Sequence, residues 1–273
     1  DVPRSLRGAE ATELLCPRGP LRFRWQELAD ERAVRRRWVH AMHEHGLVLV
    51  EIPAHKDLLS LAELLAGYAL PTVYGQTFTI KAKDEPNNLA YSSQGLQMHT
   101  DLPYYNLPPG IQLFHCVRPA PVGGESLFLD GFALARDFQL AEPSAYDFLR
   151  REPVQFFDQT RRWHLVAAHP IFRHGARGEL ERVCFNERAR DSWGDVAGAC
   201  QTEARAAELY RALESLEHFV EDRSRYVTVP LQAGEVVCVD NWRVMHSRTA
   251  FGGPRHFEGT YIDWDAAEAA WRA

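Results

Sequence analysis

The chain has 273 residues, of which 45% are hydrophobic and 25% are charged, and its formal net charge is −6 at pH 7. This composition is that of a globular protein with a sizeable core, and the acidic balance does not favour nucleic acid as a partner. No apolar run is as long as a membrane-spanning helix, so we expect no membrane partner either.

The five cysteines indicate neither a disulfide framework nor a zinc site. Their number is odd, and no Cys-x-x-Cys spacing occurs. Cys116, Cys184 and Cys238 lie in apolar runs, where a thiol usually packs as a small hydrophobic group. We therefore expect a reducing compartment, the cytoplasm.

Residues 1–24 are typical of an N-terminal arm or connector. They are rich in Arg, and Pro17 and Pro20 interrupt regular structure. No internal repeat or low-complexity linker follows. We therefore expect one domain over residues 25–273.

A helix, a strand and a second helix are predicted next. Apolar residues from Asp30 onward recur at about 3.6 positions until Gly46, a common helix stop. The apolar run at 47–52 predicts a buried strand. Asp57 is placed to cap the helix that follows.

From Thr72 onward the pattern changes to short strands with two helical insertions. Runs of β-branched and aromatic residues alternate with Gly, Pro and Asn clusters. Helical segments are predicted at 132–151, where Pro143 starts a second helix, and at 202–222. This order predicts a mostly β fold with flanking helices, a sandwich or jelly roll. The expected strands are 73–80, 111–117, 125–130, 153–158, 169–173, 180–185, 226–231, 235–240 and 257–264.

His99 and Asp101 form a His-x-Asp motif. On an extended backbone, residues two apart point the same way, so an imidazole and a carboxylate converge. They supply two of the three ligands in the two-His-one-carboxylate set that binds non-haem Fe(II). Taken alone, this short spacing is common and equally fits a polar loop.

A third ligand and an anion-binding residue follow near the C-terminus. His246 comes shortly after the strand predicted to end at Asp240, far enough along the chain to reach from another strand. Arg255 begins a further strand, and a guanidinium there can bind a carboxylate through two parallel hydrogen bonds. Each residue alone is more commonly an ordinary surface group, but their ordered combination with His-x-Asp is hard to produce by chance.

This order of motifs resembles the Fe(II)/2-oxoglutarate-dependent oxygenases, and more narrowly the TauD-like group of γ-butyrobetaine and trimethyllysine hydroxylases. The resemblance covers roughly residues 20–266 and implies a double-stranded β-helix, or jelly-roll, oxygenase core. The segments that carry it are Ala90-Tyr91-Ser92, 99–101, 108–116, Gly123-Gly124, Asp130-Gly131, 240–243 and 255–261.

The resemblance also implies roles for individual residues. His99, Asp101 and His246 would be the iron ligands. Arg255 would bind the distal carboxylate of 2-oxoglutarate, and Ser126 is a weaker candidate for the same co-substrate. The implied cofactors are Fe(II), 2-oxoglutarate and O2.

Group members that act on betaines hold a trimethylammonium in an aromatic cage, because a quaternary ammonium has no hydrogen-bond donor. The matching cage positions are Tyr74, Phe78, Tyr91 and Tyr261, and Asn88 and Asn186 match the amides that hold the substrate carboxylate. Tyr104 and Tyr105 are further pocket candidates without a firm match. Phe78 stands where γ-butyrobetaine hydroxylases usually carry Trp, which weakens the case for γ-butyrobetaine itself.

We therefore expect an enzyme that hydroxylates a small quaternary-ammonium substrate and releases succinate and CO2. One alternative is a related 2-oxoglutarate oxygenase for a betaine phosphonate, an amino acid or a sulfonate. Another is a non-catalytic jelly-roll binding module. A homodimer remains open. Group members usually carry a zinc-binding domain before the core, and residues 1–24, which lack its Cys/His cluster, resemble the connector after it.

Overall fold

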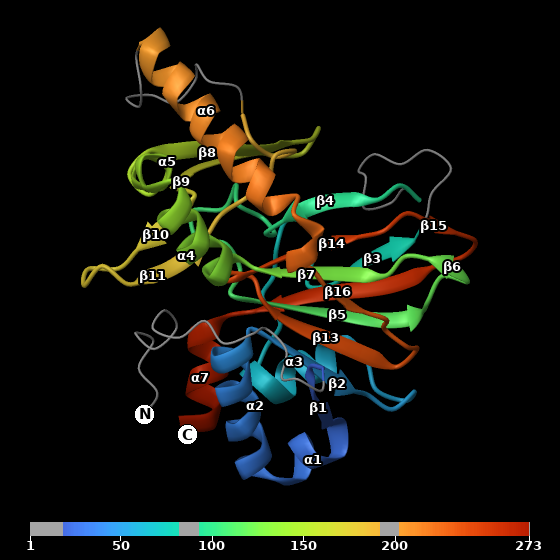
Figure 1. Cartoon of the computed structure of the whole chain (residues 1–273). Coiled ribbons are helices and arrows are strands. Elements are labelled where there is room, and N and C mark those ends of the chain that lie inside the picture. Colours follow the sequence, from blue (N-terminus) through green and yellow to red (C-terminus); the bar gives the residue numbers. More distant parts are fainter. Residues whose placement is uncertain (1–18, 82–92, 192–201, 273) are drawn as a thin grey trace.

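The computed structural model describes residues 19–81, 93–191 and 202–272, and shows two sheets stacked as layers with helices on their outer sides (Figure 1). In the six-stranded sheet, β1 pairs with β2 in parallel and every other pair is antiparallel. Its strands, in spatial order, are β1 (Leu21–Arg24), β2 (Leu47–Glu51), β13 (Glu235–Asp240), β5 (Ile111–Arg118), β16 (His256–Ile262) and β3 (Phe78–Lys81).

The second sheet is antiparallel throughout and carries two of the predicted metal ligands. Its strands, in spatial order, are β12 (Val227–Val229), β7 (Ser126–Asp130), β14 (Val244–Arg248) and β4 (Leu96–His99). Three two-stranded ribbons complete the strands. They pair β8 (Pro153–Gln159) with β9 (His164–Pro170), β10 (Phe172–His174) with β11 (Leu180–Val183), and β6 (Val122–Gly123) with β15 (Phe251–Gly252).

Strands β2 and β13 of the six-stranded sheet are buried on both faces. Leu47 and Leu49 of β2 point between the two sheets, where they meet Phe128 and Val244 of the second sheet. The alternate residues Val48 and Val50 point outward into a cluster formed with the helices. These helices are α1 (Trp25–Asp30), α2 (Arg32–His45), α3 (Leu58–Ala66) and α7 (Trp264–Arg272). Burial on both faces explains why β2 and β13 have continuous apolar sequences rather than alternating ones.

A second group of helices packs with the ribbons on the far side of the four-stranded sheet (Figure 1). Its core is rich in aromatic side chains, among them Phe138, Phe156 and Phe172, and it reaches Met98 and Met245 of the sheet. The helices are α4 (Gly131–Ala141), α5 (Pro143–Leu149) and α6 (Glu203–Val220), and the short 3₁₀ turn η3 (Arg223–Arg225) follows α6.

A buried ion pair fixes the start of β14. The guanidinium of Arg243 donates from Nη2 to Asp130 Oδ2 at 2.7 Å and from Nε to Oδ1 at 3.1 Å. Asp130 also accepts the backbone N–H groups of Phe132 and Ala133 and so caps α4. A third bond runs from Arg243 to the Glu44 carbonyl near the end of α2. The pair thus ties the approach to β14 to helices on both sides of the molecule.

Most of the predicted elements are confirmed. α2 ends at Gly46, which has the left-handed φ of 70°. Asp57 caps α3 by accepting the Ser60 N–H at 2.8 Å. Pro143 starts α5, and Thr202 caps α6. The sheet-rich arrangement with flanking helices agrees with the predicted class.

Several predicted boundaries were wrong. The strand expected at 73–80 is only β3, because residues 72–75 form a turn around Gly75, with φ of 103°. The strand expected at 169–173 is divided between β9 and β10, and that expected at 257–264 ends at Ile262, before α7. Strands β4 and β14 were not predicted, because His, Gln, Ser and Arg dilute their apolar character.

Residues 21–24, the end of the predicted arm, form β1 at the edge of the large sheet. Cys116, Cys184 and Cys238 are buried free thiols, as expected of small packed groups. Among the described helices, none is at once long enough and apolar enough to cross a membrane.

Candidate active site

The pairing of β4 with β14 brings the two predicted histidine ligands together. His99 at the end of β4 lies directly opposite His246 in β14. Their ring centroids are 4.3 Å apart. A spacing of 147 residues along the sequence is thus closed by a single antiparallel register.

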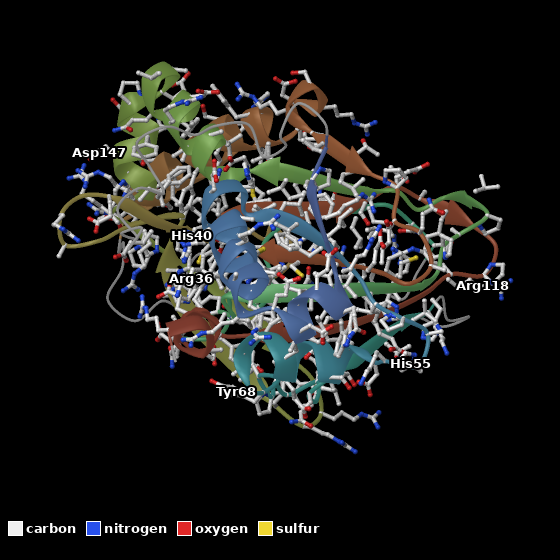
Figure 2. All side chains as sticks on the ribbon, turned by 90° about the horizontal axis from the view of Figure 1, so that it is seen from below. Arg36, His40, His55, Tyr68, Arg118 and Asp147 are labelled. Carbon is white, nitrogen blue, oxygen red and sulfur yellow. The ribbon has the colours of Figure 1, made fainter. Side chains whose placement is uncertain are left out.

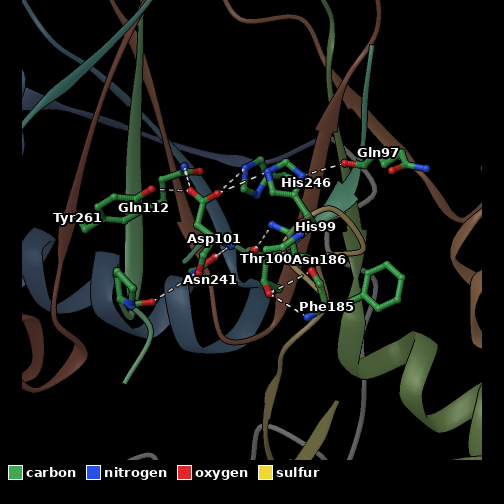
Figure 3. Close-up of polar contacts among 12 residues, drawn as sticks. Gln97, His99, Thr100, Asp101, Gln112, Phe185, Asn186, Asn241, His246 and Tyr261 are labelled. Carbon is green, nitrogen blue, oxygen red and sulfur yellow. Dashed lines mark hydrogen bonds and ion pairs between the residues drawn. The ribbon is translucent and has the colours of Figure 1, made fainter. Parts of the chain in front are cut away.

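Asp101 completes the cluster from the loop after β4 (Figure 3). Its Oδ1 lies 3.5 Å from His99 Nε2 and 3.7 Å from His246 Nε2. One ligand atom from each of the three residues lies within 4.8 Å of the others. Two imidazole nitrogens and one carboxylate oxygen at this spacing fit one ferrous ion bound on one face.

The backbone turns sharply after Asp101. Leu102 has φ of 54°, a left-handed conformation that is rare for a side chain of this kind. Asn241, in the turn between β13 and β14, holds this backbone: its Oδ1 accepts the Asp101 N–H at 2.7 Å, and its Nδ2 donates to the Asp101 carbonyl at 3.0 Å. We attribute the orientation of the Asp101 carboxylate to this two-bond clamp.

Each ligand side chain but one is oriented by a further hydrogen bond (Figure 3). His99 Nδ1 lies 2.8 Å from the Gln97 carbonyl, which can only accept, so Nδ1 carries the proton and Nε2 faces the site. Asp101 Oδ2 accepts the Tyr261 hydroxyl at 2.8 Å and also the Gln112 amide. His246 Nδ1 is buried and has no partner among the described residues.

The electrostatics of the cluster favour the ligand form of Asp101 and His246. Burial alone would raise the pKa of Asp101, but the nearby His246 and His99 and the Tyr261 hydroxyl lower it to about 2. Burial and the neighbouring His99 lower the pKa of His246 to about 4. Burial also opposes protonation of His99, but Asp101 outweighs it and raises the pKa of His99. A bound cation would replace that proton as the partner of Asp101.

One cavity of about 360 Å³ joins this cluster to almost every predicted site residue. Its size lies within the range of about 300–1,000 Å³ typical of small-molecule sites. Asn88 and Tyr91 lie outside the described residues. The predicted residues on its wall are Tyr74, Phe78, His99, Asp101, Ser126, Asn186, His246, Arg255 and Tyr261.

Arg255 is a buried cation that pairs with no carboxylate of the described residues. Its side chain is only 4% exposed, and its guanidinium lies 3.7 Å from the centroid of the Phe257 ring. Nε and Nη1 are buried without a hydrogen-bond partner in the described part of the chain. Burial and the nearby Arg248, which lines the same cavity, lower the pKa of Arg255. A buried guanidinium with two unused donors is a site for a carboxylate.

The aromatic side chains predicted for a cage lie on the same cavity but also have other contacts. The rings of Phe78 and Tyr261 are 5.4 Å apart. Tyr261 binds Asp101, and the Tyr74 hydroxyl donates to Asp158 at 2.8 Å. Asn186 is partly engaged, because its Oδ1 accepts the Ala189 N–H at 3.2 Å and its Nδ2 lies 3.4 Å from the Thr100 carbonyl.

No role was predicted for Gln112, Arg248 or Asp158, which also line the cavity. A single Gln in the apolar run of β5 was the one local signal, since a polar residue buried in a strand needs a partner. Asn241 was noted only as part of a motif.

Comparison with known proteins identifies relatives for most of the chain. Residues 9–261 match the model of the taurine catabolism dioxygenase TauD, TfdA family. The chain is 30% identical to human γ-butyrobetaine dioxygenase over 245 residues, covering 86% of this chain and 61% of that protein. It is 29% identical to trimethyllysine dioxygenase of Meyerozyma guilliermondii over 236 residues, covering 84% of this chain and 57% of that protein. The chain thus spans about three fifths of the length of these relatives.

The fold is also that of solved structures. A taurine dioxygenase from Burkholderia xenovorans superposes with a TM-score of 0.61 at 17% identity, covering 86% of this chain and 83% of that one. At this identity the similarity concerns the fold alone.

Proposed function

The chain belongs to the taurine catabolism dioxygenase TauD, TfdA family, and on this premise we propose that it is an Fe(II)- and 2-oxoglutarate-dependent hydroxylase of a small quaternary-ammonium compound. One observation carries the proposal. A single cavity contains the His99, Asp101 and His246 cluster and the unpaired guanidinium nitrogens of Arg255. A metal site beside a buried anion site is what a 2-oxo acid that chelates iron requires.

In this proposal the chain's own residues position the reactants. The two imidazoles and Asp101 would hold the iron. Tyr261 and Gln112 engage Asp101 Oδ2 and keep Oδ1 turned to the imidazoles. Arg255 holds the far carboxylate of 2-oxoglutarate, with Ser126 nearby on the wall. When bound, iron, 2-oxoglutarate and O2 supply oxidation of an unactivated C–H bond, with release of succinate and CO2.

The aromatic wall supports a cationic substrate without hydrogen-bond donors. Tyr74, Phe78, Tyr104 and Tyr261 all line the cavity, and ring faces attract a quaternary ammonium that cannot hydrogen-bond. The relatives named γ-butyrobetaine dioxygenase and trimethyllysine dioxygenase support the same substrate class. Phe78 in place of Trp leaves the particular betaine unassigned.

A second candidate is a related oxygenase for a phosphonate, a sulfonate or an amino acid. Arg188 supports it, because this exposed cation lies on the same cavity beside Asn186 and would suit a strongly anionic group. A betaine phosphonate would satisfy both the aromatic wall and Arg188.

We further propose that the two stacked sheets form the double-stranded β-helix core of this family, within one domain over residues 25–273. A reducing cytoplasm remains our predicted compartment, and a homodimer remains open.

A substrate panel tests the proposed function. The protein is incubated with Fe(II), 2-oxoglutarate and O2, in one series with amino acids and sulfonates that carry no quaternary ammonium, and in the other with γ-butyrobetaine, trimethyllysine, shorter betaines and betaine phosphonates. We expect one of them to raise succinate release and to yield a product heavier by one oxygen atom in the mass spectrum. Succinate release with only non-betaine acids would support the second candidate. No succinate release with any compound would indicate a binding module instead.

A further inference from the structure

Asp158 places a carboxylate on the wall of the cavity. It lies near the end of β8 and lines the same cavity as the metal cluster. Its Oδ2 accepts two hydrogen bonds, from the Tyr74 hydroxyl and from Trp163 Nε1, each 2.8 Å long. Two donors from separate segments fix the carboxylate in one orientation.

A chain of hydroxyl groups supports this carboxylate. The Tyr104 and Tyr74 oxygens are 2.7 Å apart, and because the Tyr74 proton points to Asp158, Tyr104 donates to Tyr74. Burial raises the pKa of Tyr74 above its ordinary value, so its hydroxyl stays a donor at neutral pH. Burial likewise raises the pKa of Tyr104. The two hydroxyls therefore form a hydrogen-bonded chain that ends on Asp158 Oδ2 and holds the carboxylate in place.

Asp158 has no counter-ion among the residues that the structure describes. In the ranges 19–81, 93–191 and 202–272, no Lys, Arg or His forms an ion pair with it, and its Oδ1 accepts no hydrogen bond. The rings of Tyr74 and Trp163 meet edge to face, with centroids 5.7 Å apart, beside it. A carboxylate and aromatic rings on the wall of one ligand cavity both attract cations. They therefore suit a cationic ligand.

We propose that Asp158 is the counter-charge for the substrate's ammonium group and determines the selectivity of the cavity for cations. The inference rests on the proposed function and goes further than an aromatic cage, because ring faces alone offer no acceptor. The Oδ1 atom can accept an N–H, so the cavity takes protonated dimethylamines as well as quaternary ammonium compounds. Selectivity is then for positive charge rather than for complete methylation.

A structural role is the competing explanation. Asp158 ties the β8–β9 ribbon to the turn at Tyr74, and its loss could disorder the wall as a whole. In that case every ligand of the cavity would bind less well, whatever its charge. If Asp158 is instead the counter-charge of the ammonium group, its loss weakens the binding of cationic ligands only.

The test is binding under anaerobic conditions, in the presence of Fe(II) and 2-oxoglutarate. Calorimetry measures the affinity for γ-butyrobetaine, its dimethylamino analogue and its neutral tert-butyl isostere, in the native protein and in Asp158→Asn. We expect the variant to lose about tenfold in affinity for both cationic ligands, the effect of one partly desolvated opposite charge, and to bind the isostere and 2-oxoglutarate unchanged.

Asp147→Asn is the matched control, because it removes the same charge at the outer edge of the molecule, where Asp147 pairs with Arg150 and Arg151 (Figure 2). We expect it to change none of the affinities. If Asp158→Asn does not fold, Asp158→Glu and Asp158→Gln replace it. Both lengthen the side chain and only Gln loses the charge, so the proposal requires weaker cation binding in Asp158→Gln alone.

The outcomes separate this inference from the proposed function. If the native protein prefers the cations and Asp158→Asn keeps that preference, Asp158 is not the counter-charge, while the betaine proposal stands. An equal loss for all three ligands would assign Asp158 a structural role and overturn the inference. If the native protein binds none of the three, or binds the isostere as well as the cations, the betaine proposal falls together with the inference.

Discussion

Replacing Arg255 by Met should make the ligand-free protein more stable while abolishing its response to 2-oxoglutarate. Two buried nitrogens of Arg255 have no hydrogen-bond partner within residues 19–81, 93–191 and 202–272, and Arg248 lies nearby. Each such unsatisfied group costs about 1–3 kcal/mol. The cation–π contacts with Phe257 and Phe251 return about 1–2 kcal/mol in total. Met fills similar space without charge, so we expect the free energy of unfolding of the ligand-free variant to rise by about 1 kcal/mol or more.

The same substitution should weaken the binding of 2-oxoglutarate. Losing one partner of a buried charge-assisted pair costs about 2–5 kcal/mol, which is at least about 30-fold in affinity. At a concentration of about 100 times the native Kd, 2-oxoglutarate should stabilise the native protein by about 2.7 kcal/mol. A variant with about 30-fold weaker binding should gain only about 0.9 kcal/mol or less under the same conditions.

Thermal unfolding with and without 2-oxoglutarate, in the presence of anaerobic Fe(II), measures both effects. Each kcal/mol corresponds to about 2 °C in Tm for a chain of this size. Arg118→Met is the control, because Arg118 is an exposed arginine at the end of β5 (Figure 2). An unchanged 2-oxoglutarate shift in Arg255→Met would show that another cation, such as Arg248, binds the co-substrate. A large loss of stability without ligand would refute the argument that the guanidinium is unpaired.

Further predictions concern the metal cluster and the wall. His246→Ala should abolish turnover and iron binding but leave the circular dichroism spectrum unchanged. Full activity of this variant would show that His246 is not a metal ligand. Tyr261→Phe keeps the ring and removes the hydroxyl from Asp101, so iron affinity measured by titration should fall about tenfold; an unchanged affinity would limit Tyr261 to the substrate wall. Gly259→Ala puts a methyl group into the Phe78 ring, which lies against Gly259. Such overpacking costs about 1–3 kcal/mol of stability and should shift that ring. We expect betaine binding to weaken about tenfold while iron binding is unchanged. An unchanged betaine affinity would show that Phe78 does not contact the substrate.

An unbroken apolar strand could be predicted most directly where both of its faces are buried. Val236, Val237, Cys238 and Val239 form an unbroken apolar run because β13 lies between the helices and the second sheet. Strands β4 and β14 carry His99 and His246, which line the cavity together with Ser247 and Arg248. These polar residues obscure the strand pattern, because they serve the site rather than the core.

The ligand triad could be predicted because the chemistry of iron restricts the residue types and their order. The residues that orient it could not. Gln112 is eleven residues from Asp101 and on another sheet, and the Tyr261 hydroxyl comes from yet another strand. Tyr261 was predicted from its ring alone, whereas its hydroxyl also supports a metal ligand. Asp158 depends on the turn at Tyr74, where the sequence pattern had predicted a strand.

The most direct test of the central claim is turnover with isotopically heavy dioxygen, Fe(II), 2-oxoglutarate and the best betaine of the panel. We expect one heavy oxygen atom in succinate and the other in the hydroxylated betaine, in equal amounts. Substitution of His99, Asp101 or His246 by Ala should remove both labels. Heavy succinate in the presence of every betaine, with no label in any of them, would contradict the proposed substrate class. The absence of label from succinate as well would contradict the assignment of the site as an iron and 2-oxoglutarate centre.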